Sequence, residues 1–250
     1  MENFVTSLQT WWAGICAEFD LNFIQKDRWK SLLTGLENTL LITVIALAIG
    51  IVIGVAVALV RTTWDLTLKS KRPSFGRGVM KVLNALCKLY TTVIRGTPMV
   101  IQLLIMYYVI FASSSNGLIV AALSFGINSG AYVSEIIRGG ILSIEKGQTE
   151  AGRSLGLNYV QTMWYVIAPQ VLKNTIPTLC NEFIVLLKET SVAGYAAVHD
   201  LTYAGNRIRG VTYSAFMPLI AVAIIYLILV VGLTKAVGVL ERRLRESDKR

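Results

Sequence analysis

Residues 39–60 form a run of 22 residues that contains no Asp, Glu, Lys, Arg or His. At about 1.5 Å per helical residue, a run of this length crosses a hydrocarbon core of about 30 Å. Residues 214–234 form a second run of this kind, with Pro218 in its first turns, where a proline costs least. Both runs predict transmembrane helices.

The composition supports a membrane environment for the chain as a whole. Apolar residues make up 54% of the 250 residues and charged residues 16%, against roughly 25% charged in soluble proteins. So few charges exclude both a soluble monomer and a disordered chain. Three dispersed cysteines (Cys16, Cys87 and Cys180) and a single histidine, His199, argue against a disulfide framework and a metal site.

A longer uncharged stretch lies between these two runs. Residues 98–134 contain 37 uncharged residues, which is too long for one span, and a turn-forming cluster interrupts them at residues 113–117. The pattern predicts a helical hairpin of two short spans. Its first half, residues 98–112, is short enough that flanking residues must complete it.

Residues 176–198 are mostly apolar but include Glu182, Lys188 and Glu189. A charge at the centre of a span costs about 2.5 to 3.5 kcal/mol on the insertion scale, so a lipid-facing helix would not tolerate three. The segment is therefore either buried against other helices or not a span at all. We count it as a span, which gives five.

Basic residues indicate the orientation. Residues 61–97 hold eight basic residues against one acidic residue, residues 235–250 hold six basic residues, and the turn at 113–117 holds none. The eight are Arg61, Lys69, Lys71, Arg72, Arg77, Lys81, Lys88 and Arg95. The positive-inside rule places both basic segments in the cytoplasm. We predict an all-α membrane bundle of five transmembrane helices with the N-terminus outside and the C-terminus in the cytoplasm. Much of the +9 charge is then a topology signal, and we expect no nucleic-acid partner.

The first 35 residues do not form a span. Six apolar residues recur there at helical spacing: Phe4, Leu8, Trp11, Trp12, Ile15 and Phe19. The pattern is typical of an amphipathic helix in the outer membrane interface, although it would also suit packing against a partner subunit. We divide the chain into an interfacial segment (1–35), a transmembrane domain (36–245) and a charged cytoplasmic tail (246–250).

Residues 138–177 form a long connection that the orientation places in the cytoplasm. Helix-forming residues surround positions 150–154 and 161–166, with Gly156 ending the first helix and Pro169 the second. The pattern predicts two short helices outside the membrane, either as a lid over the bundle or as a docking element for a soluble partner. No nucleophile elbow, Walker loop, HExxH or paired-carboxylate signature appears, which favours transport over catalysis.

Within this connection, Glu150, Ala151 and Gly152 are followed by Gly156 and then by Pro169. In residues and spacing this pattern resembles the EAA loop of bacterial ABC importer permeases. Gly152 stands where the motif has its third alanine, Val166 stands at the isoleucine position, and Ala168 stands at the leucine position.

One branch, the polar (histidine, glutamine and arginine-type) amino acid permeases, fits more of the chain. Its pattern is echoed by Leu33-Thr34-Gly35-Leu36 with Thr39, Arg95-Gly96-Thr97-Pro98 with Gln102, residues 132–140 (YVSEIIRGG), Lys146-Gly147-Gln148 and residues 181–191 (NEFIVLLKETS). The resemblance covers roughly residues 31–245. It implies a type I ABC importer permease in the bacterial cytoplasmic (inner) membrane.

The resemblance also implies partners. A second permease subunit, identical or paralogous, shares the pathway; two ABC ATPase subunits bind ATP and Mg; and an extracytoplasmic binding protein delivers an amino acid. This chain itself would bind no cofactor. The residues implied in ATPase coupling are Glu150, Ala151, Gly152, Leu155 and Gly156. The competing classes are a secondary transporter or channel and an intramembrane enzyme. Only the importer permease predicts a stable complex with a P-loop ATPase.

Polar residues within the spans are candidates for the substrate path, because a polar group in a span is a functional candidate by default. The candidates are Asn181, Glu182, Arg95, Gln102, Asn128, Ser129 and Glu135. Several alternatives stay open. Glu182 would instead form a salt bridge with Arg95 or Arg138, Glu135 would pair with Arg138, and Asn128 and Ser129 would mark a kink between Gly126 and Gly130. Gly50 and Gly54 form a GxxxG pattern for packing within or between subunits. The charges give conflicting hints about which amino acid moves.

Overall fold

The computed structural model describes residues 2–69, 74–114 and 116–246. Lys71 and Arg72 of the basic segment, Ser115 of the predicted turn and residues 247–250 of the predicted tail lie outside the described residues.

The described residues form helices joined by short turns and no strand, as the sequence predicts. The helices are α1 (Glu2–Phe19), α2 (Trp29–Thr63), α3 (Phe75–Gly96), α4 (Met99–Ile105), α5 (Gly117–Leu142), α6 (Lys146–Ser154), α7 (Tyr159–Thr162), α8 (Ala168–Glu189), α9 (Leu201–Thr212) and α10 (Phe216–Glu246). The π-helical turns Trp64–Leu68, Met106–Ile110 and Met163–Ile167 extend α2, α4 and α7, and a 3₁₀ turn, Thr190–Ala196, follows α8.

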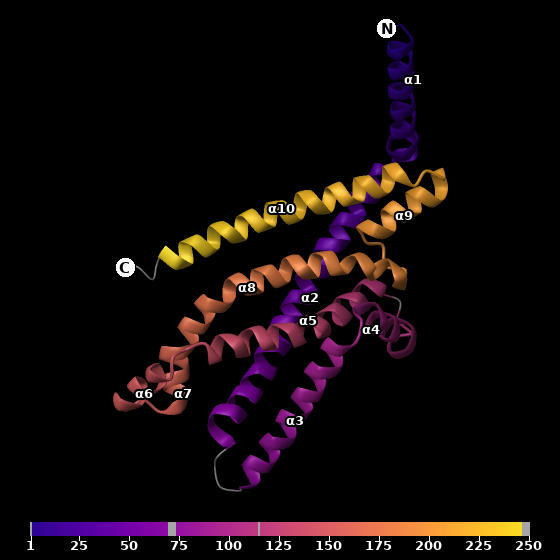
Figure 1. Cartoon of the computed structure of the whole chain (residues 1–250). Coiled ribbons are helices and arrows are strands. Elements are labelled where there is room, and N and C mark those ends of the chain that lie inside the picture. Colours follow the sequence, from indigo (N-terminus) through magenta and orange to yellow (C-terminus); the bar gives the residue numbers. More distant parts are fainter. Residues whose placement is uncertain (1, 70–73, 115, 247–250) are drawn as a thin grey trace.

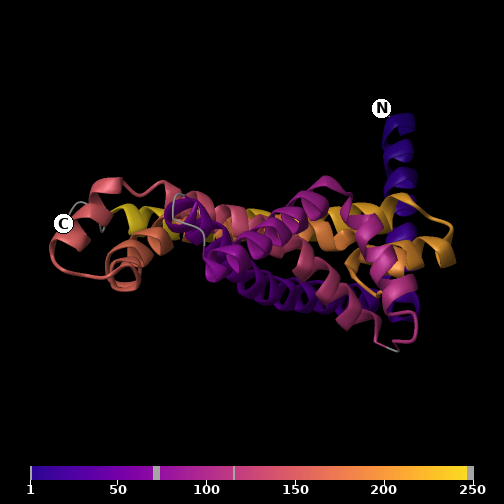
Figure 2. The ribbon, with the colours of Figure 1, turned by 90° about the horizontal axis from the view of Figure 1, so that it is seen from below.

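The long helices form an elongated bundle (Figures 1 and 2). The loop with α6 and α7 lies at the same end of the bundle as the C-terminus of α10, and α9 lies at the opposite end together with the start of α2 (Figure 1). Helix α8 runs between α5 and α10. In both views α1 stands away from the long axis of the bundle, at the end that holds α9.

Among the described residues, three helical segments are long and apolar enough to cross a membrane. They are Trp29–Leu66, Gly117–Leu142 and Phe216–Leu244. Helix α3 and the segment Met99–Ile110 form a fourth candidate if this pair, bent by 109°, counts as one span. Within the described part of the chain, α8 does not pass this test.

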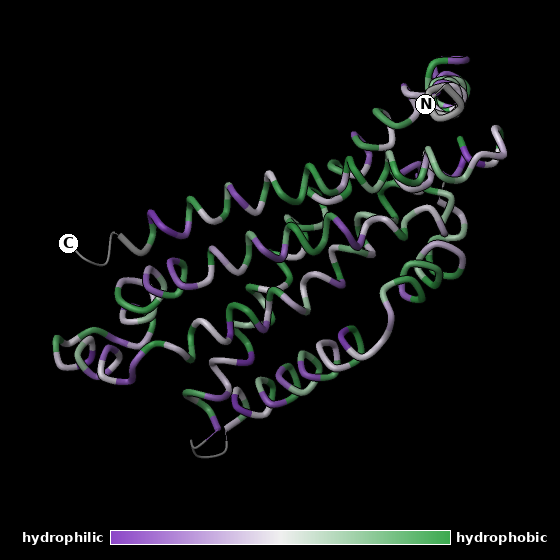
Figure 3. Tube along the Cα trace, turned by 45° about the horizontal axis from the view of Figure 1, so that its top comes forward, coloured by the Kyte–Doolittle hydropathy of each residue, from purple (hydrophilic) through white to green (hydrophobic). Residues whose placement is uncertain are grey.

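The first half of the predicted hairpin has a second bend. The segment Met99–Ile110 ends before the predicted turn at residues 113–117 and α5 begins at Gly117, but α3 completes the first half across a bend of 109° at Gly96–Pro98. The break has a local cause: Thr97 is extended, with φ −121° and ψ 147°, and Pro98 follows it. A proline excludes the helical conformation from the residue before it, so α3 cannot continue. Helix α3 alternates hydrophobic and hydrophilic residues along its length (Figure 3).

The boundaries predicted for the next span were also wrong. The helix is α8, which begins at Ala168 and ends at Glu189, well before residue 198. Pro169 does not end the preceding helix; it lies in the first turn of α8, where a proline needs no backbone N–H partner. Asp200 then begins α9, because its carboxylate accepts hydrogen bonds of 3.0 Å from the backbone N–H groups of Thr202 and Tyr203.

Glycines allow α2 and α5 to pack closely. A Cβ added to Gly54 would lie 2.5 Å from Cγ1 of Val133, and one added to Gly126 would lie 2.7 Å from Cβ of Ile49. The GxxxG pattern of α2 therefore serves packing within one chain. Gly126 accepts a side chain of α2, and α5 runs as one helix from Gly117 to Leu142, so the predicted kink is not its role.

The junction after α1 is held to the bundle, while α1 is not. Asn22 is fully buried, and its Oδ1 accepts a hydrogen bond of 2.8 Å from the hydroxyl of Thr212. Phe23 packs in the core beside α9. By contrast, Trp11 and Trp12 on α1 are 63% and 62% exposed. Helix α2 begins at Trp29, so it crosses the predicted segment boundary at residues 35 and 36.

Candidate functional site

The coupling loop is the first candidate site, and a glycine shapes its turn. The N–H of Gly156 donates to the carbonyl of Arg153 at 3.0 Å, and the N–H of Leu157 donates to the carbonyl of Gly152 at 3.1 Å. These two bonds form a Schellman motif at the end of α6. Gly156 adopts φ +82°, which L side chains rarely adopt, so it ends the first helix as the sequence predicts.

A second glycine brings α6 against α7. A Cβ added to Gly152 would lie 2.7 Å from Cγ2 of Thr162, so the two helices touch where the motif has an alanine. Helix α7 begins with a capping box, in which Asn158 and Gln161 bond each other's backbone N–H groups. The packed and capped loop therefore forms one folded unit.

The outer surface of this unit exposes the remaining predicted coupling residues. Leu155 is 82% exposed, and Ala151 and Glu150 are exposed on α6. Glu150 lies inside α6, whose N-cap is Glu145, so it does not cap this helix. An exposed leucine beside a fixed turn offers a contact surface to another protein.

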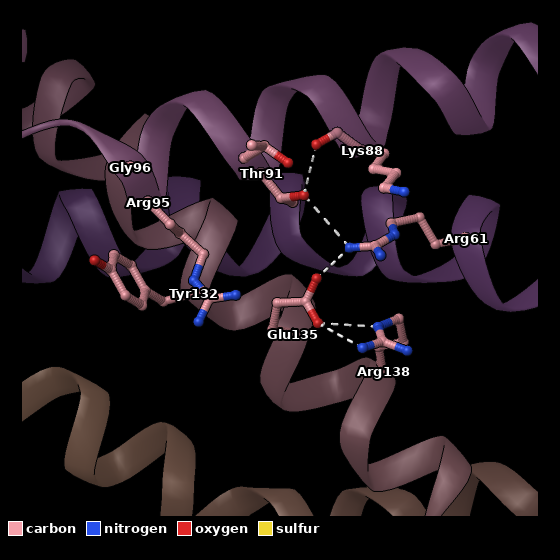
Figure 4. A pocket seen from close by; sticks show the side chains of 9 residues that line it. Arg61, Lys88, Thr91, Arg95, Gly96, Tyr132, Glu135 and Arg138 are labelled. Carbon is pink, nitrogen blue, oxygen red and sulfur yellow. Dashed lines mark hydrogen bonds and ion pairs between the residues drawn. The ribbon is translucent and has the colours of Figure 1, made fainter.

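The second candidate site is a polar groove between α2, α3 and α5 (Figure 4). One carboxylate, Glu135, bridges two guanidinium groups. It accepts bonds from Nε and Nη2 of Arg138 at 2.9 and 2.8 Å, and it also pairs with Arg61. Arg61 reaches the hydroxyl of Thr91 at 3.4 Å, so this network ties α3 to the other two helices. The predicted pairing of Glu135 with Arg138 is confirmed.

The groove carries an excess of positive charge. Four cations line its volume of about 500 Å³ (Arg61, Lys88, Arg95 and Arg138) against the single carboxylate of Glu135. The guanidinium of Arg95 lies 5.3 Å from the ring centroid of Tyr132, a cation–π contact, and forms no ion pair with any described residue. Such a groove suits an anionic group.

Gln102 fastens the bend between α3 and α4 to α5. Its Nε2 donates to the carbonyls of Ile94 and Thr97 at 2.7 and 3.1 Å, and its Oε1 accepts from Asn128 at 3.0 Å. Asn128 is buried. Two predicted path residues therefore stabilise the bend through hydrogen bonds to backbone and to each other.

Ser129 connects α5 to α8. Its hydroxyl donates a hydrogen bond of 3.1 Å to Oε1 of Glu182 on α8. Glu182 is half-buried and forms no ion pair with Arg95, Arg138 or any other cation in the described part of the chain. Asn181, the next residue along α8, is exposed.

The seven predicted path residues thus form two groups. Arg95 and Glu135 line the groove, where Gln102 and Asn128 hold the bend beside it; Ser129, Glu182 and Asn181 belong to the contact between α5 and α8 and to its edge. Sequence reasoning missed Arg61 and Tyr132. Arg61 is the first charge after the charge-free run and could have drawn attention, whereas no sequence signal links Tyr132 to Arg95.

Comparisons with known proteins identify the family of this chain. Residues 74–246 match the family described as binding-protein-dependent transport system inner membrane component. The chain is 35% identical over 223 residues to the probable glutamine ABC transporter permease protein GlnM of Bacillus subtilis (88% of this chain, 96% of that protein). It is 34% identical over 220 residues to the arginine transport system permease protein ArtQ of the same organism (87% and 94%).

A solved structure is similar over nearly the same residues. A chain of a crystal structure described as an amino acid ABC transporter with histidines superposes with a TM-score of 0.76 at 36% identity. The match covers 88% of this chain and 98% of that chain.

Proposed function

This chain belongs to the family of binding-protein-dependent transport system inner membrane components, and we propose that it transports an amino acid, because relatives are named as permeases for glutamine and arginine. It is the permease subunit of an ATP-binding-cassette importer for an amino acid, a type I permease in fold, and a multi-pass membrane protein. It is not an enzyme: hydrolysis of ATP belongs to the ATPase subunit, and a binding protein supplies the substrate.

The finer assembly is a proposal. Two permease subunits, either two copies of this chain or this chain and a paralogue, enclose a pathway in the bacterial cytoplasmic membrane. ATP and Mg occupy the partner ATPase alone. The described fold supports five crossings, because α2, the pair α3 and α4, α5, α8 and α10 each run between the end with α6 and the end with α9. With α6 in the cytoplasm, this path gives an external N-terminus and an internal C-terminus.

The single observation that carries the coupling role is the folded unit of α6 and α7. It lies beyond the helices of the bundle, it is fixed by the turn at Gly156, and it exposes Leu155. A rigid unit at the end of a bundle can transmit the closure of an ATPase as a rigid-body motion of the spans. We assign ATPase contact to this surface, with Glu150 and Ala151 beside Leu155.

The cargo is a polar amino acid. The relatives are named for glutamine and arginine, and the groove between α2, α3 and α5 offers cations to a carboxylate while Glu182 offers a carboxylate to an ammonium group. An amino acid carries both groups. Arg95, Gln102, Asn128, Ser129, Glu135, Asn181 and Glu182 therefore remain our candidates for the substrate path.

Co-purification tests the assembly. The chain should be isolated with a P-loop ATPase and a paired permease, and the reconstituted complex should take up one or a few members of a panel of the twenty amino acids when its binding protein and ATP are present. A chain that purifies alone and transports on an ion gradient without ATP would place the protein among secondary transporters.

A second measurement tests the path. Glu182→Gln keeps the shape of the side chain and an oxygen that can accept from Ser129, so assembly and basal ATP hydrolysis should be retained. Uptake should fall sharply because the charge is lost. Normal uptake by this variant would remove Glu182 from the path, and poor assembly would assign it a structural role.

A further inference from the structure

Helix α1 carries an apolar face that the described part of the chain leaves largely uncovered. Trp11 and Trp12 are more than half exposed, Phe19 is 51% exposed, and Ile15 is partly exposed between them. At 3.6 residues per turn, these four side chains fall within about one third of the circumference of the helix. The opposite side holds small or polar residues, which are Thr6, Thr10, Ala13 and Ala17. The helix is therefore amphipathic, with its apolar face outside the bundle.

The direction of α1 is fixed by the elbow between α1 and α2. Besides the bond that buried Asn22 forms with α9, Nη1 of Arg28 donates a hydrogen bond to the carbonyl of Leu21 across the elbow. Lys26 and Asp27 both adopt left-handed conformations, with φ of 57° and 54°, so the chain turns sharply there. Helix α1 therefore leaves the bundle across its long axis in a defined direction (Figures 1 and 2).

Exposed aromatic residues surround the point where α1 leaves the bundle. Tyr213 and Phe216 follow closely after Thr212, the residue that bonds Asn22, and Trp29 is the first residue of α2; all three aromatic side chains are exposed. Tryptophan and tyrosine are enriched where a membrane meets water. Helices α2 and α10, which are long and apolar enough to cross a membrane, both begin among these residues. Because α1 starts at this level and stands across the bundle axis, it runs along the membrane surface.

We infer that α1 lies in the membrane interface at this end of the bundle, with its tryptophan face in the lipid, and that it anchors the permease to the bilayer surface. Helix α1 contains no Lys or Arg, and its only charged residues are Glu2 and Glu18. Binding therefore depends on burial of the apolar face and needs no anionic lipid. In the proposed topology this is the external interface, but the anchor itself requires only that the chain spans the membrane.

Spin labels test the inference in the full chain. The importer complex is prepared with Cys16, Cys87 and Cys180 replaced by alanine and with partner subunits free of cysteine. Single cysteines then replace Trp12 and Ile15 on the apolar face, and Ala13→Cys and Ala17→Cys are matched controls on the opposite side at nearly the same distance from the elbow. All four positions lie on α1, outside the packed bundle, so folding should be retained.

The labelled complexes are placed in vesicles of phosphatidylcholine, which has no net charge. Paramagnetic resonance measures how often each label collides with oxygen, which concentrates in lipid, and with a nickel chelate, which stays in water. We expect labels at positions 12 and 15 to favour oxygen and labels at 13 and 17 to favour the chelate. Shielding of 12 and 15 from both would mean that a protein partner covers the face, and chelate contact at all four positions would mean that α1 lies in water. Either result would overturn the inference.

A third result would overturn it as well: oxygen contact at all four positions would mean that α1 is immersed in the hydrocarbon core. The readout is a collision rate and not uptake. A folded complex that fails to transport an amino acid would therefore count against the proposed function and leave this measurement intact.

Discussion

The contact between α2 and α5 and the loop of α6 and α7 both depend on glycine, but for different physical reasons. In the bundle, Gly54 leaves no room for a side chain, because an added Cβ would lie 2.5 Å from Val133. In the loop, an added Cβ at Gly156 would meet nothing within 4 Å, and the constraint is the backbone φ of +82°. Gly152 belongs to the loop, but its constraint is lack of space, as at Gly54, because an added Cβ would be crowded by Thr162.

The difference shows how folding of the bundle can be separated from contact between the loop and the ATPase. Packing of α2 on α5 decides whether the chain folds in the membrane at all. The turn at Gly156 lies outside that packing, so a change there should leave the bundle intact and alter only what the loop contacts. Substitutions at the two kinds of glycine should therefore fail at different steps.

Gly54→Val should give the largest effect. Its methyl groups would overlap Val133 within a tightly packed helix pair, and overpacking of this kind costs about 1 to 3 kcal/mol or more. We expect the amount of protein in the membrane, measured by immunoblot, to fall severely. Gly232→Val on α10 is the matched control, because nothing lies within 4 Å of its Cβ position. Equal levels for both variants would show that close packing at Gly54 is not needed for folding.

Gly156→Val should give the second-largest effect, and this effect should be on ATPase coupling and not on folding. A β-branched residue at positive φ costs about 1 to 2 kcal/mol and would deform the Schellman turn. Membrane level should stay normal while hydrolysis of ATP stimulated by the binding protein and amino acid is lost. Gly156→Asn should retain more activity, because asparagine tolerates this conformation better. Wild-type stimulation in the valine variant would place Gly156 outside the coupling contact.

Gly152→Ala restores the alanine typical of the motif, yet it should weaken coupling in this chain. The added methyl would meet Cγ2 of Thr162 at 2.7 Å and push α6 from α7. Stimulated ATP hydrolysis should fall by less than in Gly156→Val. Thr162→Ser removes the crowding methyl, so the double variant should recover part of the loss, and Gly147→Ala, with open space around it, should change nothing. An additive loss in the double variant would contradict the contact.

Sequence reasoning reached the fold class, the two charge-free helices and the turn at Gly156 because each depends on local composition or local backbone conformation. It failed where a long-range contact or a single proline decides. The bend before Pro98 lies at the start of the uncharged stretch, where charge alone gives no sign of it. Helix α8 begins at Ala168, although Pro169 was expected to end a helix. Arg61 and Glu135 are 74 residues apart, so their pairing depends on how α2 lies on α5.

The smallest effect is expected at the partner of Gly152. The hydroxyl of Thr162 is buried and has no hydrogen-bond partner among the described residues. It therefore loses its hydrogen bonds to water on folding and gains none in the protein. Thr162→Val has nearly the same shape and replaces that hydroxyl with a methyl group. Removing an unpaired buried polar group should stabilise the loop by about 1 kcal/mol, or leave it unchanged. Hydrogen exchange at the amides of α6 and α7 in the purified complex should slow, with stimulated ATP hydrolysis retained. Faster exchange would instead contradict the prediction and mean that the hydroxyl stabilises the contact between α6 and α7.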